Sequence, residues 1–184
     1  MAEIASKVMD VQLKTSPLAL SDATGTAEAA LDEAAAFCAQ KMQLAGRDAV
    51  VDCLRQGDGC ACGYFSYALA EQVAECIGEL DGSVRAVYVA DYDATPQDVC
   101  FDDTHHAPLV HLIIWAERRS AALTALVSVL DRALVEGYGE MVDASDLKHL
   151  LDAQIVDDGD VKGRVGYGAL LSSIYNRPVR VWQR

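Results

Sequence analysis

Residues 109–115 constrain the fold more than any other segment of this chain. They read Leu-Val-His-Leu-Ile-Ile-Trp, with almost no polar alternation. A strand whose side chains are apolar on both sides is typical of the middle of a sheet that is covered on both faces. We therefore expect a central strand here, sandwiched between two amphipathic helices at 64–80 and 120–141.

Periodicity and turn residues predict the other elements. Helices are expected where apolar residues recur at intervals of three and four or where an alanine-rich segment follows a capping residue: 24–42, 48–54, 64–80, 120–141, 145–150 and 169–175. Strands are expected at 84–90, 109–115, 153–156 and 179–182. Residues 1–23 show no sustained period and are interpreted as an N-terminal arm. The sequence predicts a single α+β domain over 24–184, with a mixed three- to four-stranded sheet packed by amphipathic helices.

The charge of the chain limits its partners. Fifteen Lys and Arg residues against 28 Asp and Glu residues give a formal net charge of -13, and 52% of the residues are hydrophobic, enough for a sizeable core. Such a charge repels phosphate backbones and anionic lipid, so we expect neither nucleic acid nor a membrane as partner. No stretch approaches the roughly 18 apolar residues of a membrane helix, and the first residues do not resemble a signal peptide. We therefore expect a cytoplasmic protein.

Cysteines form the first candidate site. Cys60 and Cys62 stand one residue apart in the segment 57–63, whose glycines suggest a loop, just before the helix expected at 64–80. Cys53 precedes Cys60 by seven residues. The positive end of the helix would favour their thiolates, which could bind a soft metal or undergo oxidation. Zinc sites usually pair two short units whose ligands are about two to four residues apart, and a second unit is missing. The favoured interpretation is buried thiols that serve as small hydrophobic residues.

Histidines form the second candidate site. His105 and His106 follow two aspartates just before the central strand, so either could ligate a transition metal. Successive side chains in a loop diverge, which argues against both binding one ion. His111 lies inside the apolar strand, where we expect a neutral, hydrogen-bonded core histidine.

Carboxylates at strand ends form the third candidate site. Asp91 and Asp93 follow the first strand, and Asp152 or Asp157 could join them from the third. Together they could hold Mg²⁺ and the phosphates of a substrate. The acidic run at 157–160 is otherwise expected to be a solvated turn, and the polar residues of helix 120–141, including Asp131, are expected to face water.

The order of elements over residues 64–157 loosely resembles the minimal nucleotidyltransferase core. In that family a Gly-Ser pair ends the first strand and an Asp-x-Asp pair opens the second. This chain has Ala90-Asp91-Tyr92 and Val110-His111-Leu112 at those places. The resemblance implies at most a degenerate, non-catalytic relative.

Two segments suggest association with other chains. The alanine-rich helix 24–42 allows close packing, including packing against a second copy. The basic C-terminus either closes the core with Trp182 or offers Arg177, Arg180 and Arg184 to an acidic surface. We therefore expect a binding or self-assembly module, with a homo-oligomer as one outcome. The alternatives are a metal-dependent phosphoryl or nucleotidyl transferase that uses the carboxylates, and a thiol-based metal or redox site.

Overall fold

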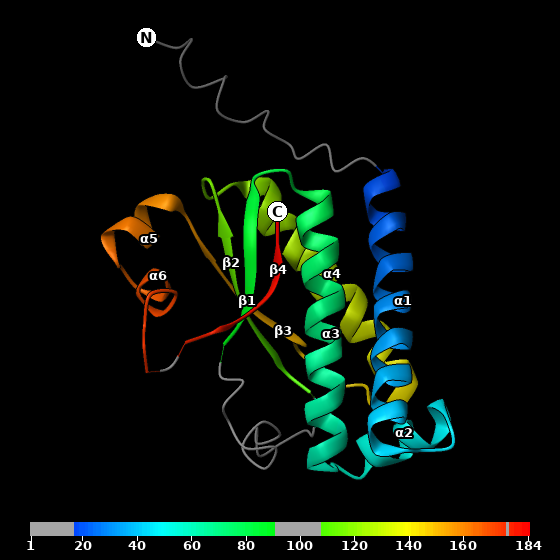
Figure 1. The fold of residues 1–184 in the computed structure, drawn as a ribbon. Coiled ribbons are helices and arrows are strands. Elements are labelled where there is room, and N and C mark those ends of the chain that lie inside the picture. The colour runs from blue at the N-terminus through cyan, green and yellow to red at the C-terminus, as the bar shows by residue number, and fades with distance from the viewer. Residues whose placement is uncertain (1–16, 91–107, 176) are drawn as a thin grey trace.

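The computed structural model describes residues 17–90, 108–175 and 177–184, and over these ranges the predicted single α+β domain is confirmed (Figure 1). The helices are α1 (Pro17–Met42), α2 (Arg47–Arg55), α3 (Gly59–Leu80), α4 (Ala121–Val142), α5 (Asp158–Gly163) and α6 (Tyr167–Leu170). The strands are β1 (Val84–Val89), β2 (Val110–Ala116), β3 (Leu151–Val156) and β4 (Val179–Gln183). No helix within the described ranges is long and apolar enough to cross a bilayer.

The four strands form one mixed sheet in the order β3-β2-β1-β4. β2 pairs antiparallel with β1 and parallel with β3, and β1 pairs antiparallel with β4. The apolar run therefore lies inside the sheet, as its sequence predicts. Leu112, Ile113 and Ile114 follow one another and are each at most 1% exposed, so both faces of β2 are covered at its middle.

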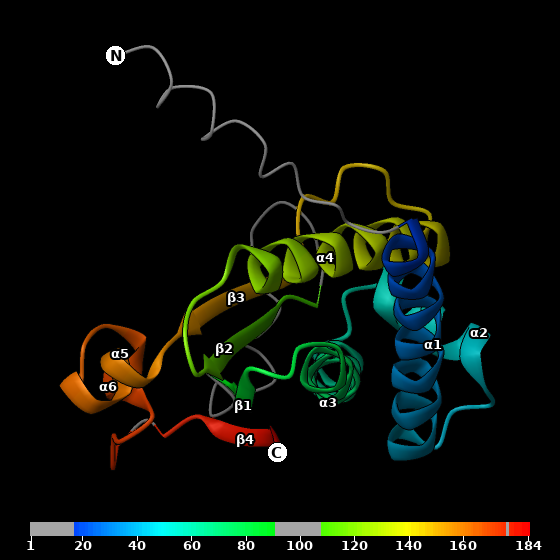
Figure 2. The same cartoon turned by 90° about the horizontal axis from the view of Figure 1, so that it is seen from above.

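The main core lies on one face of the sheet. Leu112 and Ile114 belong to the cluster of buried apolar residues that α1, α3 and α4 complete, whereas Ile113, which points the other way, does not. α3 and α4 thus pack on the same side of β2, and α1 packs against both of them (Figure 2). The expected sandwich of β2 between these two helices is wrong. α4 is the crossover between the parallel strands β2 and β3, and it shares its apolar stripe with α1 and α3 as well as with the sheet.

Helix α1 uses its small residues inside this chain. Ala27, Ala30 and Ala34 are buried against the neighbouring helices. The alanine face of α1 is therefore buried within this chain and is not the free association surface that the alanine pattern suggested. α1 also begins at Pro17, within the stretch interpreted as an arm.

Capping residues set several helix boundaries. Ser120 accepts a hydrogen bond from the backbone N–H of Leu123 (3.0 Å) and starts α4 as predicted. Asp58 accepts one from the N–H of Ala61 (2.8 Å), so α3 begins at Gly59 and includes residues 59–63, which the glycines suggested were a loop. The helical turn expected at 145–150 is absent.

Candidate functional site: a groove beside the free edge of β3

A groove of about 450 Å³ separates α4 from β3. One wall is α4 between Thr124 and Asp131, and the other is β3 between Leu151 and Ile155. β3 is the last strand on its side of the sheet, so the groove runs along a sheet edge. A helix and an edge strand on either side of a groove are well placed to hold an extended chain.

The pairing of β3 with β2 determines which of its backbone groups face the groove. The N–H of Val110 donates to the carbonyl of Leu150 (2.8 Å), and Val110 is in register with Leu151. In a parallel ladder of this register the even-numbered residues of β3 bond to β2. Leu151, Ala153 and Ile155 consequently direct their N–H and C=O groups away from β2, toward the free edge.

Asp131 occupies the beginning of this edge. Its Oδ1 accepts hydrogen bonds from the N–H groups of Leu150 and Leu151 (both 2.9 Å), and its Oδ2 lies 2.7 Å from Nδ1 of His149. The carboxylate is only 14% exposed, so the expectation that it faces water is wrong. The helical pattern around Asp131 could not predict these contacts, because both carboxylate oxygens bind residues 149–151, which follow the end of α4.

Ala153 and Ile155 differ from Leu151. Over the parts of the chain that the structure describes, no group meets their outward N–H and C=O groups. Their side chains are partly exposed beside Val127 of α4. Within its described residues, the structure therefore presents a short row of unpaired backbone donors and acceptors next to the apolar side chain of Val127.

Asp152 and His111 lie on the opposite face of the sheet. Nδ1 of His111 is 3.1 Å from Oδ2 of Asp152, and Gln154 Nε2 donates to Oδ1 (3.0 Å). The histidine is hydrogen-bonded as expected, but its side chain is 39% exposed and is therefore not part of the core. The reason is its register: His111 stands directly opposite Asp152, a partly exposed carboxylate. At the place where the nucleotidyltransferase resemblance would put acidic residues, β2 thus has this histidine.

Asp157 is a helix cap. Its Oδ1 accepts hydrogen bonds from the N–H groups of Gly159 (2.8 Å) and Asp160 (3.0 Å). In return, Oδ2 of Asp160 accepts a hydrogen bond from the N–H of Asp157 (3.0 Å). The run 157–160 is therefore the first turn of α5 and not a solvated turn. The N–H of Asp157, and after it the guanidinium of Arg119 at 2.6 Å, holds the pKa of Asp160 below its usual value.

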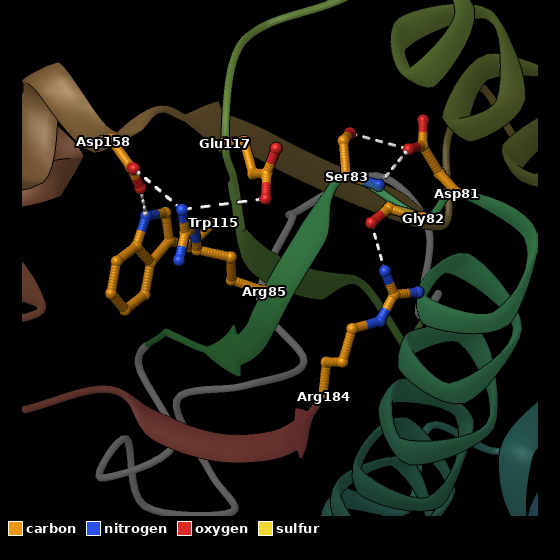
Figure 3. Close-up of polar contacts among 8 residues, drawn as sticks. All are labelled: Asp81, Gly82, Ser83, Arg85, Trp115, Glu117, Asp158 and Arg184. Atoms are coloured by element: carbon orange, nitrogen blue, oxygen red, sulfur yellow. Dashed lines mark hydrogen bonds and ion pairs between the residues drawn. The ribbon is translucent and has the colours of Figure 1, made fainter.

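Asp158 joins α5 to the sheet (Figure 3). Its Oδ1 accepts from Trp115 Nε1 (2.9 Å) and its Oδ2 from Arg85 (3.0 Å), which is also 3.7 Å from Glu117. These contacts fix the end of β3 relative to β1 and β2. Both oxygens of Asp158 are engaged in holding the fold.

The paired cysteines point to different sides of α3. Cys60 is exposed and Cys62 is buried. Because an α-helix turns about 100° per residue, side chains two residues apart point in nearly opposite directions. Cys53 is partly exposed on α2. The helix that replaces the expected loop therefore prevents Cys60 and Cys62 from facing one ligand together.

Two other cysteines behave as core residues. Burial is the main cause that raises the pKa of both the Cys38 and the Cys76 thiol to about 11. In the described part of the chain, no three His, Cys, Asp or Glu side chains converge as metal ligands. Four predicted ligands lie outside the described residues: Asp91, Asp93, His105 and His106.

Comparison of the chain with protein-family models, with curated proteins and with solved structures finds no significant match. Among the described residues, the groove beside β3 combines outward backbone N–H and C=O groups, an apolar contact at Val127 and a volume of about 450 Å³.

Proposed function

We propose that this chain is an interaction domain that binds an extended segment as an added strand along the free edge of β3. The observation that carries the proposal is the outward direction of the N–H and C=O groups of Ala153 and Ile155, which meet no described group. An added strand would pair with them, and backbone pairing supplies affinity in this mode of recognition.

The two edges of the sheet differ, and the difference favours β3. The register of β4 shifts between Val87 and Tyr88 of β1, and Pro178 and Arg180 mark this edge. Bulges, prolines and basic residues are features with which natural sheets prevent edge pairing. β3 pairs with β2 in a regular register through all six of its residues and contains no Lys, Arg or Pro.

The C-terminal strand serves the core of its own chain. Trp182 packs against Gly78 of α3, which fits the simpler interpretation of this strand as one that closes the core. The guanidinium of Arg184 donates to the carbonyl of Gly82 (Figure 3). It also donates to the carbonyl of Gly78, at 3.0 Å. Arg184 is therefore engaged within the chain, and the alternative interpretation, in which it would meet an acidic surface from a pairing edge, gains no support.

The α4 wall can be covered without losing hydrogen bonds. The hydroxyls of Thr124 and Ser128 donate to the carbonyls of Ser120 (3.1 Å) and Thr124 (2.9 Å) in their own helix. A buried hydroxyl without a partner would oppose binding, and these two already have partners. Val127, between them, offers an apolar contact to an incoming side chain.

Amide hydrogen exchange measured by NMR tests the proposal. In a dilute sample we expect Ala153 and Ile155 to exchange faster than Asp152 and Gln154, whose N–H groups bond to β2. An eight-residue peptide of alternating valine and threonine should protect the first pair, and its N-methylated counterpart should not. If neither that peptide nor a higher protein concentration changes exchange at Ala153 and Ile155, the edge accepts no strand and the proposal is wrong.

The enzyme and thiol alternatives gain no specific support. Asp152 and Asp157 are each hydrogen-bonded within the fold, and Cys60 and Cys62 diverge. We retain self-association and a cytoplasmic location as proposals that suit an interaction domain.

A further inference from the structure

We propose that the strand added to β3 is β3 of a second copy of the chain, so that two sheets join across a two-fold axis. This inference rests on the proposed function and names the partner of the same edge. The reasons are the sequence of β3, the direction of its backbone groups and the distribution of charge along the groove.

The sequence of β3 is complementary to itself in the antiparallel direction. Residues 151–155 read Leu-Asp-Ala-Gln-Ile, which has the same pattern in both directions about Ala153. With Ala153 on the two-fold axis, Leu151 lies opposite Ile155 of the second copy and Asp152 lies opposite Gln154. Apolar residues thus meet apolar residues, and the carboxylate meets an amide rather than another carboxylate.

The backbone groups permit this register. Because Ala153 faces outward, the two Ala153 residues form a hydrogen-bonded pair and exchange two bonds across the axis. Each Ile155 N–H donates to the outward carbonyl of Leu151 in the other copy, which adds two more. The N–H of Leu151, already bonded to Asp131, is not needed as a donor.

A register centred on Gln154 would also form four bonds, because Ala153 would then pair with Ile155. Side chains decide between the two registers. Centred on Gln154, the carboxylate of Asp152 would lie opposite Val156, an apolar residue that is 2% exposed. The register centred on Ala153 avoids that contact.

The groove is suited to a second copy despite the net charge of -13. The lining has two carboxylates, Asp131 and Asp152. Asp131 already has three partners, and Asp152 is hydrogen-bonded to His111 and Gln154 and would lie opposite an amide of the second copy. The repulsion between two acidic chains therefore acts over longer distances and is screened by salt. We expect self-association to strengthen between low salt and 0.5 M NaCl, whereas an interface held by opposite charges would weaken.

Sedimentation velocity of the full chain from 1 to 200 µM tests the inference with a matched pair of variants. Ala153→Pro removes the outward N–H and no bond to β2, so we expect the dimer dissociation constant to rise at least ten-fold. Ala153→Val keeps that N–H and should still dimerise. Circular dichroism and urea unfolding of both variants confirm that the monomer remains folded.

Disulfide crosslinking reports the register. Hydrogen-bonded antiparallel partners have Cα atoms about 5.5 Å apart, within the range of a disulfide. Under mild oxidation Ala153→Cys should form a covalent dimer above the background of the native cysteines, and Gln154→Cys should form much less. Crosslinking of Gln154→Cys alone would overturn the register centred on Ala153.

The outcomes separate this inference from the proposed function. A monomer at 200 µM whose edge amides are protected by the valine and threonine peptide refutes the second copy and leaves strand addition standing. A dimer that Ala153→Pro does not weaken forms through another surface and also refutes the inference. Protection of Ala153 and Ile155 in a monomer at every concentration would mean that a segment of the same chain covers the edge, and would overturn it as well.

Discussion

The contact between Gly78 and Trp182 gives a quantitative test of how β4 is held. A Cβ added at Gly78 would lie 2.3 Å from Cε2 and Cζ2 of the Trp182 ring, closer than any packed pair of carbons. Gly63, in the same helix, has nothing within 4 Å of the corresponding position. Gly78 and Gly63 therefore form a matched pair within α3, the first against a ring and the second in open space.

Replacement of either glycine by alanine brings the same gain in the helix. Alanine is more favourable than glycine inside a helix by about 0.5–1 kcal/mol, so Gly63→Ala should raise the free energy of unfolding by that amount. Gly78→Ala must also displace the indole of Trp182, and overpacking of this kind costs about 1–3 kcal/mol. The helix gain cancels between the two variants, so Gly78→Ala should be less stable than Gly63→Ala by about 1–3 kcal/mol.

Urea unfolding followed by circular dichroism measures this difference. For a chain of this length, about 2–4 °C in Tm corresponds to each kcal/mol, which provides a second readout. When Trp182 is replaced by leucine, much of the clash is removed and Gly78→Ala should become close to neutral or stabilising. Equal stability of Gly78→Ala and Gly63→Ala in the presence of Trp182 would refute the packing of β4 against α3 described above.

Three further predictions concern thiols, carboxylates and pH. A thiol reagent applied to the native protein should modify Cys60, while Cys62 should react only after unfolding; mass spectrometry of the labelled peptides distinguishes them. Asp131→Ala should lower the free energy of unfolding by about 1–3 kcal/mol in urea titrations, because two backbone donors at the beginning of β3 lose their acceptor, and Asp131→Asn, which keeps one oxygen, should lose less. The pKa of Asp160 is lowered from its usual 3.8, so its contribution is complete above that pH and is lost as the pH falls through the folded value. The stability difference between wild type and Asp160→Asn should therefore be largest at neutral pH and should shrink below about pH 4; a constant difference would contradict the assignment.

Some of the sequence predictions failed although the signals that decide them are local. Residues 59–63 contain two glycines and two cysteines, which suggested a loop, yet Asp58 caps a helix that includes them. The acidic run at 157–160 suggested a solvated turn, yet Asp157 and Asp160 form a capping box. In both cases an aspartate side chain accepts hydrogen bonds from backbone N–H groups within the next three residues. This capping starts a helix in a segment whose composition favours a loop or a turn.

The sequence by itself determined the elements whose cause is local. The apolar run of β2 has to be covered on both faces, and Ser120 followed by an apolar stripe has to begin an amphipathic helix, because those preferences act between residues a few positions apart. The free edge of β3 is of another kind. Which of its N–H groups face outward depends on its register with β2, some 40 residues earlier in the chain, and Asp131 reaches amides 19 and 20 residues away. Only tertiary packing brings these groups together, since hydrogen bonds between distant segments leave no periodic trace in either segment.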